Sequence, residues 1–169
     1  MPRSADRRVP FWGVLAVTVL LDRITKMIAE SRLVWGDAPI PVIGDFTRWR
    51  LVYNTGAAFG LHLGSYSRWA FMLIACVAVV VLYKMWREAD VADRFRQLAL
   101  AFVAGGAVGN LIDRVLSARG VVDFIDMGIG EGLRWPTYNV ADIAVTCGAL
   151  ALAISLWRED ARRAPAPTA

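Results

Sequence analysis

The sequence contains very little histidine and cysteine. His62 is the single histidine, and the two cysteines, Cys76 and Cys147, each lie inside an apolar run. A metal site would have to be built almost entirely from carboxylates, and a Ser-His or Cys-His nucleophile would depend on His62 alone. Both cysteines fit a packing role as small apolar side chains. The sequence therefore argues against a metal centre and against both kinds of nucleophile.

Charge is scarce inside the long apolar runs. Of the 169 residues 57% are hydrophobic, and the mean hydropathy is +0.45. This balance is typical of a small membrane protein with a single domain. The net charge of +4 comes from Lys and Arg clusters that flank apolar runs. Clusters in that position are typical of membrane borders, so they argue against a nucleic-acid partner.

Four apolar segments are close to the roughly 20 residues that a membrane helix needs. They predict spans at about 11–29, 66–86, 96–115 and 137–157, with a disordered tail at about 161–169. Four spans place both termini on one side, and the basic residues before the first span favour the cytoplasm for that side. Tryptophans at span ends predict aromatic belts at the membrane surfaces: Trp12, Trp69, Trp86, Trp135 and Trp157.

The two outer segments, at about 32–62 and 116–136, carry strand patterns. Trp49, Leu51 and Tyr53 alternate with their neighbours, and turn residues follow at Asn54 to Gly56. A second strand-like stretch at 121–125 precedes a glycine-rich run. The predicted fold is a mostly α membrane protein with four transmembrane helices and a small extracytoplasmic β-sheet.

Polar side chains from five segments are expected at one depth, in the outer third of the membrane. Helix direction brings together the ends of the first and third spans, the start of the fourth and the outer loops. Ionisable residues inside a membrane are functional candidates. The candidates are Asp22, Asn54, Asn110, Asp113, Arg114, Asp123, Asn139 and Asp142.

Structural roles are alternatives for several of these residues. Asp22 is close enough in sequence to pair with Arg23 or Lys26, and helix capping is a second structural role for it. Asp113 beside Arg114 predicts an ion pair at the end of the third span. Asn110 suits a hydrogen bond between helices. The glycines at 105, 106 and 109 indicate close helix packing.

Asp123 and Asp142 have no basic neighbour in the sequence. Two carboxylates that meet in a low-dielectric site do not both ionise easily, so one keeps its proton. Such a pair supplies a general acid and a general base for hydrolysis of an amide by water. The positive end of the fourth helix favours the negative charge on Asp142.

Two other functions use the same residues differently. A proton-coupled small membrane transporter would also need buried acids, but its relay requires ionisable groups through the full membrane depth. The inner halves of the last three spans offer only Lys84 and Arg96, near their ends. A non-enzymatic assembly factor would leave Asp123 and Asp142 without a role.

Five blocks of sequence resemble lipoprotein signal peptidase, also called signal peptidase II, a bacterial intramembrane aspartic peptidase. The similarity extends over almost the whole chain, and the blocks follow in the family's order. They are LDRITK at 21–26, YNTGAAFG at 53–60, GGAVGNLIDR at 105–114, VVDFID at 121–126 and YNVAD at 138–142.

The resemblance implies that Asp123 and Asp142 are the catalytic dyad. It implies a structural role for Asp113 and supporting or substrate-binding roles for Asp22, Asn54, Gly56, Asn110, Arg114 and Asn139. The implied reaction removes the signal peptide of a prolipoprotein on the amino side of a cysteine that carries diacylglycerol. The implied protein is a monomer of the bacterial inner membrane, in contact with lipid, without cofactor or metal, and with the segment around Asn54 covering the site.

Overall fold

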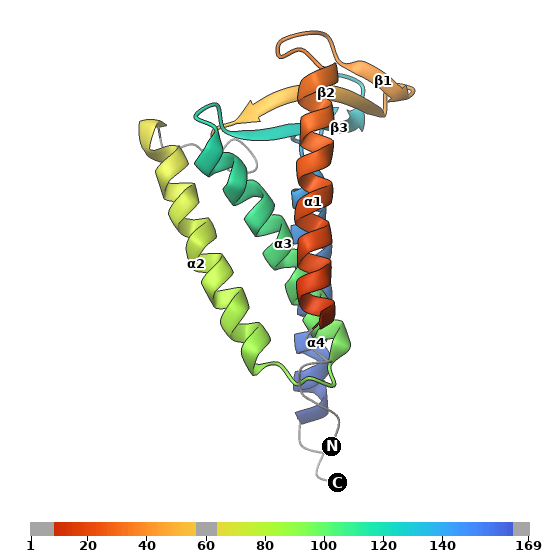
Figure 1. Cartoon of the computed structure of the whole chain (residues 1–169). Coiled ribbons are helices and arrows are strands. Elements are labelled where there is room, and N and C mark those ends of the chain that lie inside the picture. Colours follow the sequence, from red (N-terminus) through yellow and green to blue (C-terminus); the bar gives the residue numbers. More distant parts are fainter. Residues whose placement is uncertain (1–8, 57–63, 164–169) are drawn as a thin grey trace.

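The structure, a computed structural model, describes residues 9–56 and 64–163 (Figure 1). Four long helices lie beneath a small sheet, and the first helix begins and the last helix ends at the opposite end of the molecule. The prediction of a mostly helical protein with a small antiparallel sheet is confirmed. The helices are α1 (Val9–Arg32), α2 (Ser67–Glu88), α3 (Arg94–Leu116) and α4 (Val140–Arg163), and a short 3-10 helix, η2 (Gly64–Tyr66), precedes α2.

Three helices in the described part of the chain are long and apolar enough to cross a membrane: Ser67–Glu88, Arg94–Leu116 and Val140–Ala161. The helix α4 continues to Arg163, beyond the start of the predicted tail, and the remaining tail residues lie outside the described residues. Large apolar side chains are exposed along the helices, for example Leu73 and Leu150. Such a surface suits contact with lipid chains.

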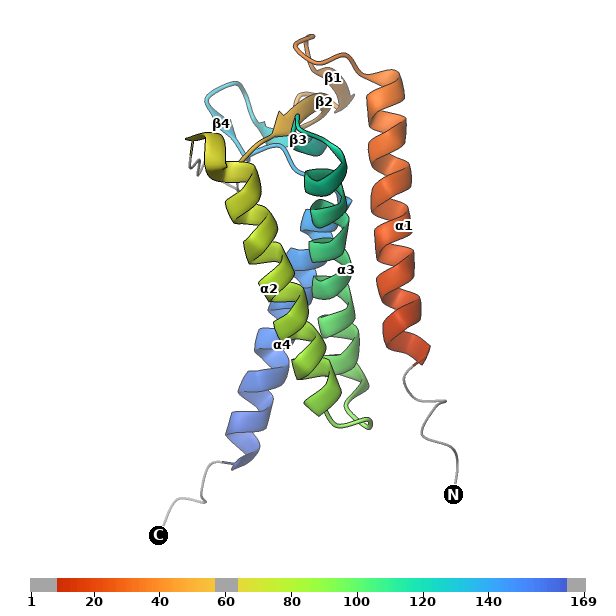
Figure 2. The same ribbon diagram turned by 60° about the vertical axis from the view of Figure 1, so that its left-hand side comes forward.

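The helix α3 occupies the centre of the bundle, where it contacts each of the other three helices (Figure 2). Glycines permit this close approach. A Cβ at Gly106 would overlap the carbonyl oxygen of Ala141 on α4, and a Cβ at Gly109 would lie 2.7 Å from an Asp22 carboxylate oxygen on α1. Small residues at helix contacts serve this purpose in membrane proteins. The predicted packing role of these glycines is therefore correct.

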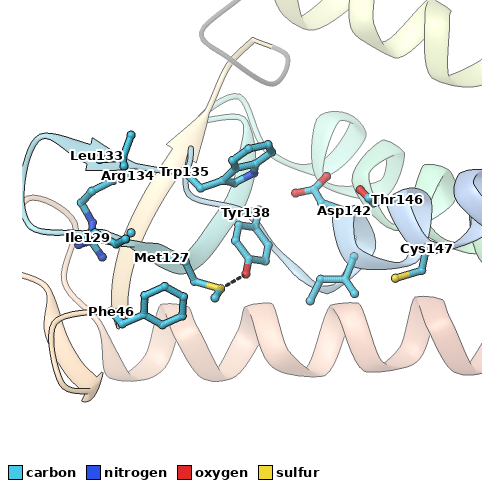
Figure 3. A pocket seen from close by; sticks show the side chains of 12 residues that line it. Phe46, Met127, Ile129, Leu133, Arg134, Trp135, Tyr138, Asp142, Thr146 and Cys147 are labelled. Atoms are coloured by element: carbon cyan, nitrogen blue, oxygen red, sulfur yellow. Dashed lines mark hydrogen bonds between the residues drawn. The ribbon is translucent and has the colours of Figure 1, made fainter.

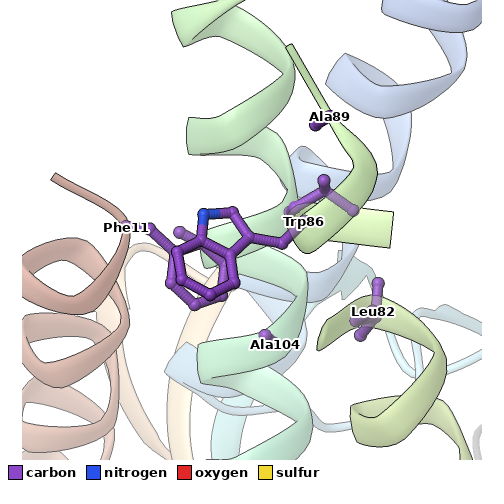
Figure 4. Close-up of a cluster of buried hydrophobic side chains, with 7 residues drawn as sticks. Phe11, Leu82, Trp86, Ala89 and Ala104 are labelled. Carbon is purple, nitrogen blue, oxygen red and sulfur yellow. The ribbon is translucent and has the colours of Figure 1, made fainter. Parts of the chain in front are cut away.

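A cluster of apolar side chains holds the ends of the helices that lie far from the sheet (Figure 4). Phe11 of α1 stacks on Trp86 of α2 with ring centroids 4.3 Å apart, and Leu100 of α3 is fully buried beside them. Trp86 is only 5% exposed. Its predicted place in an aromatic belt is wrong, because its side chain faces the bundle. The other four predicted belt tryptophans are exposed.

The sheet is antiparallel in the order β1-β2-β3-β4. Its strands are β1 (Ile40–Ile43), β2 (Thr47–Asn54), β3 (Val121–Ile129) and β4 (Leu133–Arg134). The register of β2 on β3 shifts between Trp49 and Val52, where a bulge interrupts the pairing. The shift matters for function, because beyond it Asn54 lies close to Asp123, within hydrogen-bond distance.

A buried ion cluster joins three of the strands. It lies on the face of β3 opposite to Asp123. Asp126 accepts hydrogen bonds from Nε of Arg48 at 2.9 Å and from Nε of Arg134 at 2.7 Å. Burial opposes a charge on Asp126, but the hydrogen bonds from Arg134 and Arg48 outweigh it, so the pKa of Asp126 lies below its ordinary value. The charged cluster holds β2, β3 and β4 in one register above the helices.

Candidate active site

Asp142 is fixed by the first turn of α4. Asn139 precedes the helix, and its side-chain oxygen accepts a hydrogen bond from the Asp142 N–H at 2.9 Å. In return, Asp142 Oδ2 accepts the Asn139 N–H at 3.1 Å. This reciprocal pair is a capping box, which satisfies two amide groups of the helix end at once. The spacing of Asn139 and Asp142 in the sequence therefore determines where the carboxylate of Asp142 lies.

Asp123 reaches the same place from the sheet. Successive side chains of a strand point to opposite faces, so Asp123 and Asp126 leave β3 on different sides. Asp123 accepts hydrogen bonds from the Asn54 amide at 3.0 Å and from the Asn139 amide at 2.7 Å. Asn54 belongs to β2, so both strands that cover the bundle help to orient this carboxylate.

Asn139 connects the two carboxylates directly. It is fully buried, and its amide donates to Asp123 while its backbone N–H and side-chain oxygen bind Asp142. Asn110 on α3 also holds Asp142: its amide donates to Asp142 Oδ1 at 2.8 Å, and its side-chain oxygen accepts from the Asn139 amide at 3.1 Å. Asp123 of the sheet and Asp142 of α4 thus share Asn139 as a hydrogen-bond partner.

Two buried acids from α1 and α3 lie next to this pair. Asp22 accepts the Ala141 N–H at 2.9 Å and therefore caps a further amide of α4. Its ion partner is Lys26, at 2.7 Å. Both alternatives considered for Asp22, pairing and capping, are therefore realised together.

The predicted ion pair between Asp113 and Arg114 is wrong. Adjacent residues of a helix point in different directions. Asp113 turns towards α1, where it pairs with Arg23 and Lys26, and it also accepts the Val122 N–H of β3 at 3.2 Å. These contacts fit the structural role expected for Asp113.

Arg114 turns the other way, towards the two carboxylates. Its guanidinium donates to the carbonyl oxygens of Asn110 at 3.1 Å and Gly56 at 3.3 Å. Its charge is attracted to those of Asp142 and Asp123. Gly56 is therefore joined to the site through its backbone. Residues 57–60 of the YNTGAAFG block, which follow the part of the predicted cover around Asn54, lie outside the described residues.

The environment of Asp123 favours its protonated form. Burial and the nearby charge of Asp142 raise the pKa of Asp123 from 3.8 to about 7, although hydrogen bonds from Asn54 and Asn139 act in the opposite direction. A carboxyl group with this pKa still carries its proton in a large fraction of molecules at neutral pH. It can therefore donate the proton while a charged partner accepts one.

The two carboxylates line a cavity of about 260 Å³ between α3, α4 and the sheet. A larger apolar cavity of about 580 Å³ adjoins it and shares Trp135, Tyr138, Asp142 and Thr146 (Figure 3). In the figure, Phe46, Met127 and Ile129 border the larger cavity on the sheet side, and Thr146 and Cys147 border it on α4. The smaller cavity, which both carboxyl groups line, therefore adjoins a larger apolar cavity.

Sequence reasoning missed the roles of Lys26 and of the Asp126 cluster. Lys26 was considered only as a partner of Asp22, whereas it also contacts Asp113 and Asn110. Asp126 stands in the VVDFID block, three residues after Asp123, and that odd spacing on a strand was a signal that it faces the opposite side. Of its partners, Arg48 comes from β2, 78 residues earlier, and Arg134 from the adjacent strand β4, eight residues later.

Comparisons with known proteins point to one family. The sequence profile of the family described as Signal peptidase (SPase) II matches residues 14–158. A protein of Janthinobacterium sp. (strain Marseille) named lipoprotein signal peptidase is 40% identical over 150 residues, 87% of each chain. A lipoprotein signal peptidase of Ectopseudomonas mendocina (strain ymp) is 40% identical over 163 residues, 95% of each chain.

Solved structures show the same fold. A bacterial membrane enzyme determined by the in meso method at 2.3 Å resolution superposes with a TM-score of 0.80 at 30% identity, covering 94% of each chain. A second one, at 1.9 Å resolution, gives a TM-score of 0.74 at 32% identity, covering 86% of this chain and 91% of the other. The helices and sheet described above are therefore shared with membrane enzymes.

Proposed function

This chain belongs to the signal peptidase II family of membrane enzymes, and from that premise we propose that it is an aspartic endopeptidase with Asp123 and Asp142 as its catalytic dyad. Its function is the removal of signal peptides from prolipoproteins, as the names of its relatives state. The scissile bond lies on the amino side of a diacylglyceryl-modified cysteine.

The proposal is carried by one observation: two carboxyl groups line one cavity, and Asn139 binds both of them. In the proposed mechanism Asp142 is the general base and Asp123 is the general acid. Asp142 removes a proton from a water molecule as the water oxygen attacks the carbonyl carbon. Asp123 donates its proton to the carbonyl oxygen. When the C–N bond breaks, the proton held by Asp142 passes to the leaving amine, and one hydroxyl group of the intermediate gives a proton to Asp123 as the new carboxyl group forms, which restores both aspartates.

The surrounding side chains have supporting roles. Asn110 and Asn139 hold the ionised Asp142, and Asn54 and Asn139 hold Asp123. Arg114 lies on the wall of the cavity and partly balances the negative charge. Fixed groups of this kind stabilise charge that moves during the reaction, because they need no reorganisation when it moves.

The helix α1 is proposed as the fourth membrane span. Its 24 residues extend over about 36 Å at 1.5 Å per residue, which exceeds the roughly 30 Å hydrocarbon layer. Its charged residues Asp22 and Lys26 face the bundle and are fully buried. Their ion pairs remove the main objection to placing charges at this depth.

The proposed orientation places both termini in the cytoplasm and the sheet at the outer surface of the inner membrane. Three arginines precede α1, and such residues favour the cytoplasmic side. The carboxylates then lie near the outer surface, where a lipid-anchored cysteine would hold the scissile bond. A monomer suffices for this chemistry, since one chain supplies every group of the proposed mechanism.

The transporter alternative is not favoured. The matched relatives are named as peptidases, and the buried acids cluster at one level next to the sheet instead of forming a relay through the bundle.

The substrate assignment predicts a strong preference for lipid-modified substrate. We expect the purified protein in detergent to cleave a diacylglyceryl-modified prolipoprotein with a kcat/KM at least about a hundredfold above that for the same polypeptide without lipid, because the anchor positions the scissile bond. Mass spectrometry should find the lipidated cysteine at the new amino terminus. Equal cleavage of both substrates would contradict the assignment.

A further inference from the structure

The ammonium group of Lys26 has no part in the mechanism above, although it is fully buried. It lies 2.7 Å from an Asp22 oxygen, 2.8 Å from an Asp113 oxygen and 3.0 Å from the side-chain oxygen of Asn110. An ammonium group has three protons and cannot accept a hydrogen bond. Lys26 therefore donates a hydrogen bond to Asn110, a residue that contacts Asp142, and forms ion pairs with Asp22 and Asp113.

The hydrogen bond from Lys26 to Asn110 determines which way the Asn110 amide points. The two ends of an asparagine amide have nearly the same shape, but one only accepts hydrogen bonds and the other only donates them. Because Lys26 only donates, the Asn110 oxygen must face Lys26. The NH2 group then faces Asp142, where it donates at 2.8 Å. The amide of Asn139 reinforces the same orientation by donating to the Asn110 oxygen at 3.1 Å.

We propose that Lys26 is a positioning residue for catalysis: it orients the Asn110 amide so that a hydrogen-bond donor is held against the ionised carboxylate of Asp142. The inference rests on the proposed function. A donated hydrogen bond favours the charged form of a carboxylate. With the amide reversed, the Asn110 oxygen would face the Asp142 carboxylate and oppose its charge. Lys26 thereby helps to keep Asp142 as the base of the dyad.

The charged groups around Lys26, Asn110 and Asp142 come from every element packed against these three residues. On α1 Lys26 contacts Asp22, and on α3 it contacts Asp113. Asp113 also pairs with Arg23. Asp142 interacts with the charges of Arg114 on α3 and Asp123 on β3, and the charge of Lys26 itself also acts on Asp123. Arg23 gives a matched comparison, because it pairs with the same Asp113 but its described contact is with the other carboxylate oxygen.

The first test compares Lys26→Met with Arg23→Gln under single-turnover conditions across pH. We expect Lys26→Met to lower kcat by about 10- to 100-fold, the effect of one hydrogen bond to a charged group. KM should stay near the wild-type value, because the described lining of the cavity does not include Lys26. The acid limb of the pH profile should move to higher pH, since ionised Asp142 loses support. Arg23→Gln should leave kcat and this limb near wild type.

A second variant separates orientation from charge. Lys26→Met combined with Asp22→Asn removes one positive and one negative charge, so the net charge of the cluster is unchanged. The asparagine oxygen can still accept the Ala141 N–H that Asp22 now binds. If amide orientation matters, this folded double variant keeps the low kcat and the displaced acid limb. If Lys26→Met alone does not fold, the double variant still tests whether Lys26 has a positioning role.

Three results would overturn the inference: wild-type kcat and pH profile in either folded Lys26 variant, an equal loss in Arg23→Gln, or failure of both Lys26 variants to fold, which would make Lys26 a structural residue. Asp142→Asn, assayed in parallel, separates the two proposals. If wild type does not cleave, or if Asp142→Asn cleaves as wild type does, the proposed function fails. If only the Lys26 variants behave as wild type, the proposed function stands and Lys26 has no positioning role.

Discussion

Replacing Asp123 or Asp142 with asparagine is expected to reduce kcat by about 10²- to 10⁴-fold each, the usual contribution of a general acid or base. Asparagine has nearly the shape of aspartate, so the cavity and the surrounding helices should stay in place. Asparagine at position 142 cannot take a proton from water. Asparagine at position 123 cannot donate a proton to the carbonyl oxygen as a carboxylic acid does. Cleavage of a lipid-modified prolipoprotein, followed by gel shift or mass spectrometry, measures both losses.

The control for these variants is Asp37→Asn, at an exposed position outside the site, which should cleave at the wild-type rate. The double variant, with asparagine at 123 and 142, should lose little more than either single variant, because groups that act as a unit are not additive. A folded Asp123→Asn or Asp142→Asn protein with near-normal kcat would show that the dyad is assigned to the wrong residues.

The second large effect is expected from Gly106→Val. A Cβ at this position overlaps the Ala141 carbonyl oxygen and lies 2.7 Å from a side-chain carbon of Val145. The neighbouring atom is backbone of α4, so the two helices must move apart. Overpacking of this kind costs about 1 to 3 kcal/mol of stability. The separation also displaces Asp142, one residue after Ala141, so cleavage should fall with stability.

Gly13→Val is the matched control, since a Cβ at Gly13 meets nothing within 4 Å. Thermal unfolding in detergent and cleavage rates would be recorded for both variants. We expect a lower midpoint and little cleavage for Gly106→Val, and near wild-type behaviour for Gly13→Val. Equal midpoints and equal rates in the two variants would mean that α3 and α4 do not depend on close contact at Gly106.

Much of the fold could be predicted because hydrophobic periodicity is a local signal. The apolar runs predict the helices, and the alternation around Trp49 predicts β2. The spacing of Asn139 and Asp142 is local as well, since a capping residue and the third helical residue are always close. The approach of Asp123 to Asp142 depends on the register of β2 and β3 and on how the sheet lies over the bundle. Sequence spacing alone does not show whether Asp123 and Asp142 lie close together. The family resemblance is what implies that they act as a pair.

The errors and omissions arose where contacts join distant segments. Asp113 was paired with its sequence neighbour Arg114, whereas its partners lie on α1 about 90 residues away. Trp86 was placed in the membrane interface because it ends an apolar run, but it stacks on Phe11. The role of Lys26 depends on three acceptors from two helices, and no pattern within one segment reveals it.

The central claim is that one carboxyl group of the dyad is protonated while the other is ionised, and the pH dependence of kcat tests it most directly. The pKa of Asp123 is about 7, so its proton is present below that pH and is lost as pH rises through it. Cleavage should therefore decline above about pH 7, by up to about tenfold per unit, and also at acid pH, because a general base must be unprotonated to accept a proton. A bell-shaped profile is the expected result, and Asp123→Asn should lack the alkaline decline in its residual rate. A rate that keeps rising through alkaline pH would contradict a dyad in which Asp123 must donate a proton.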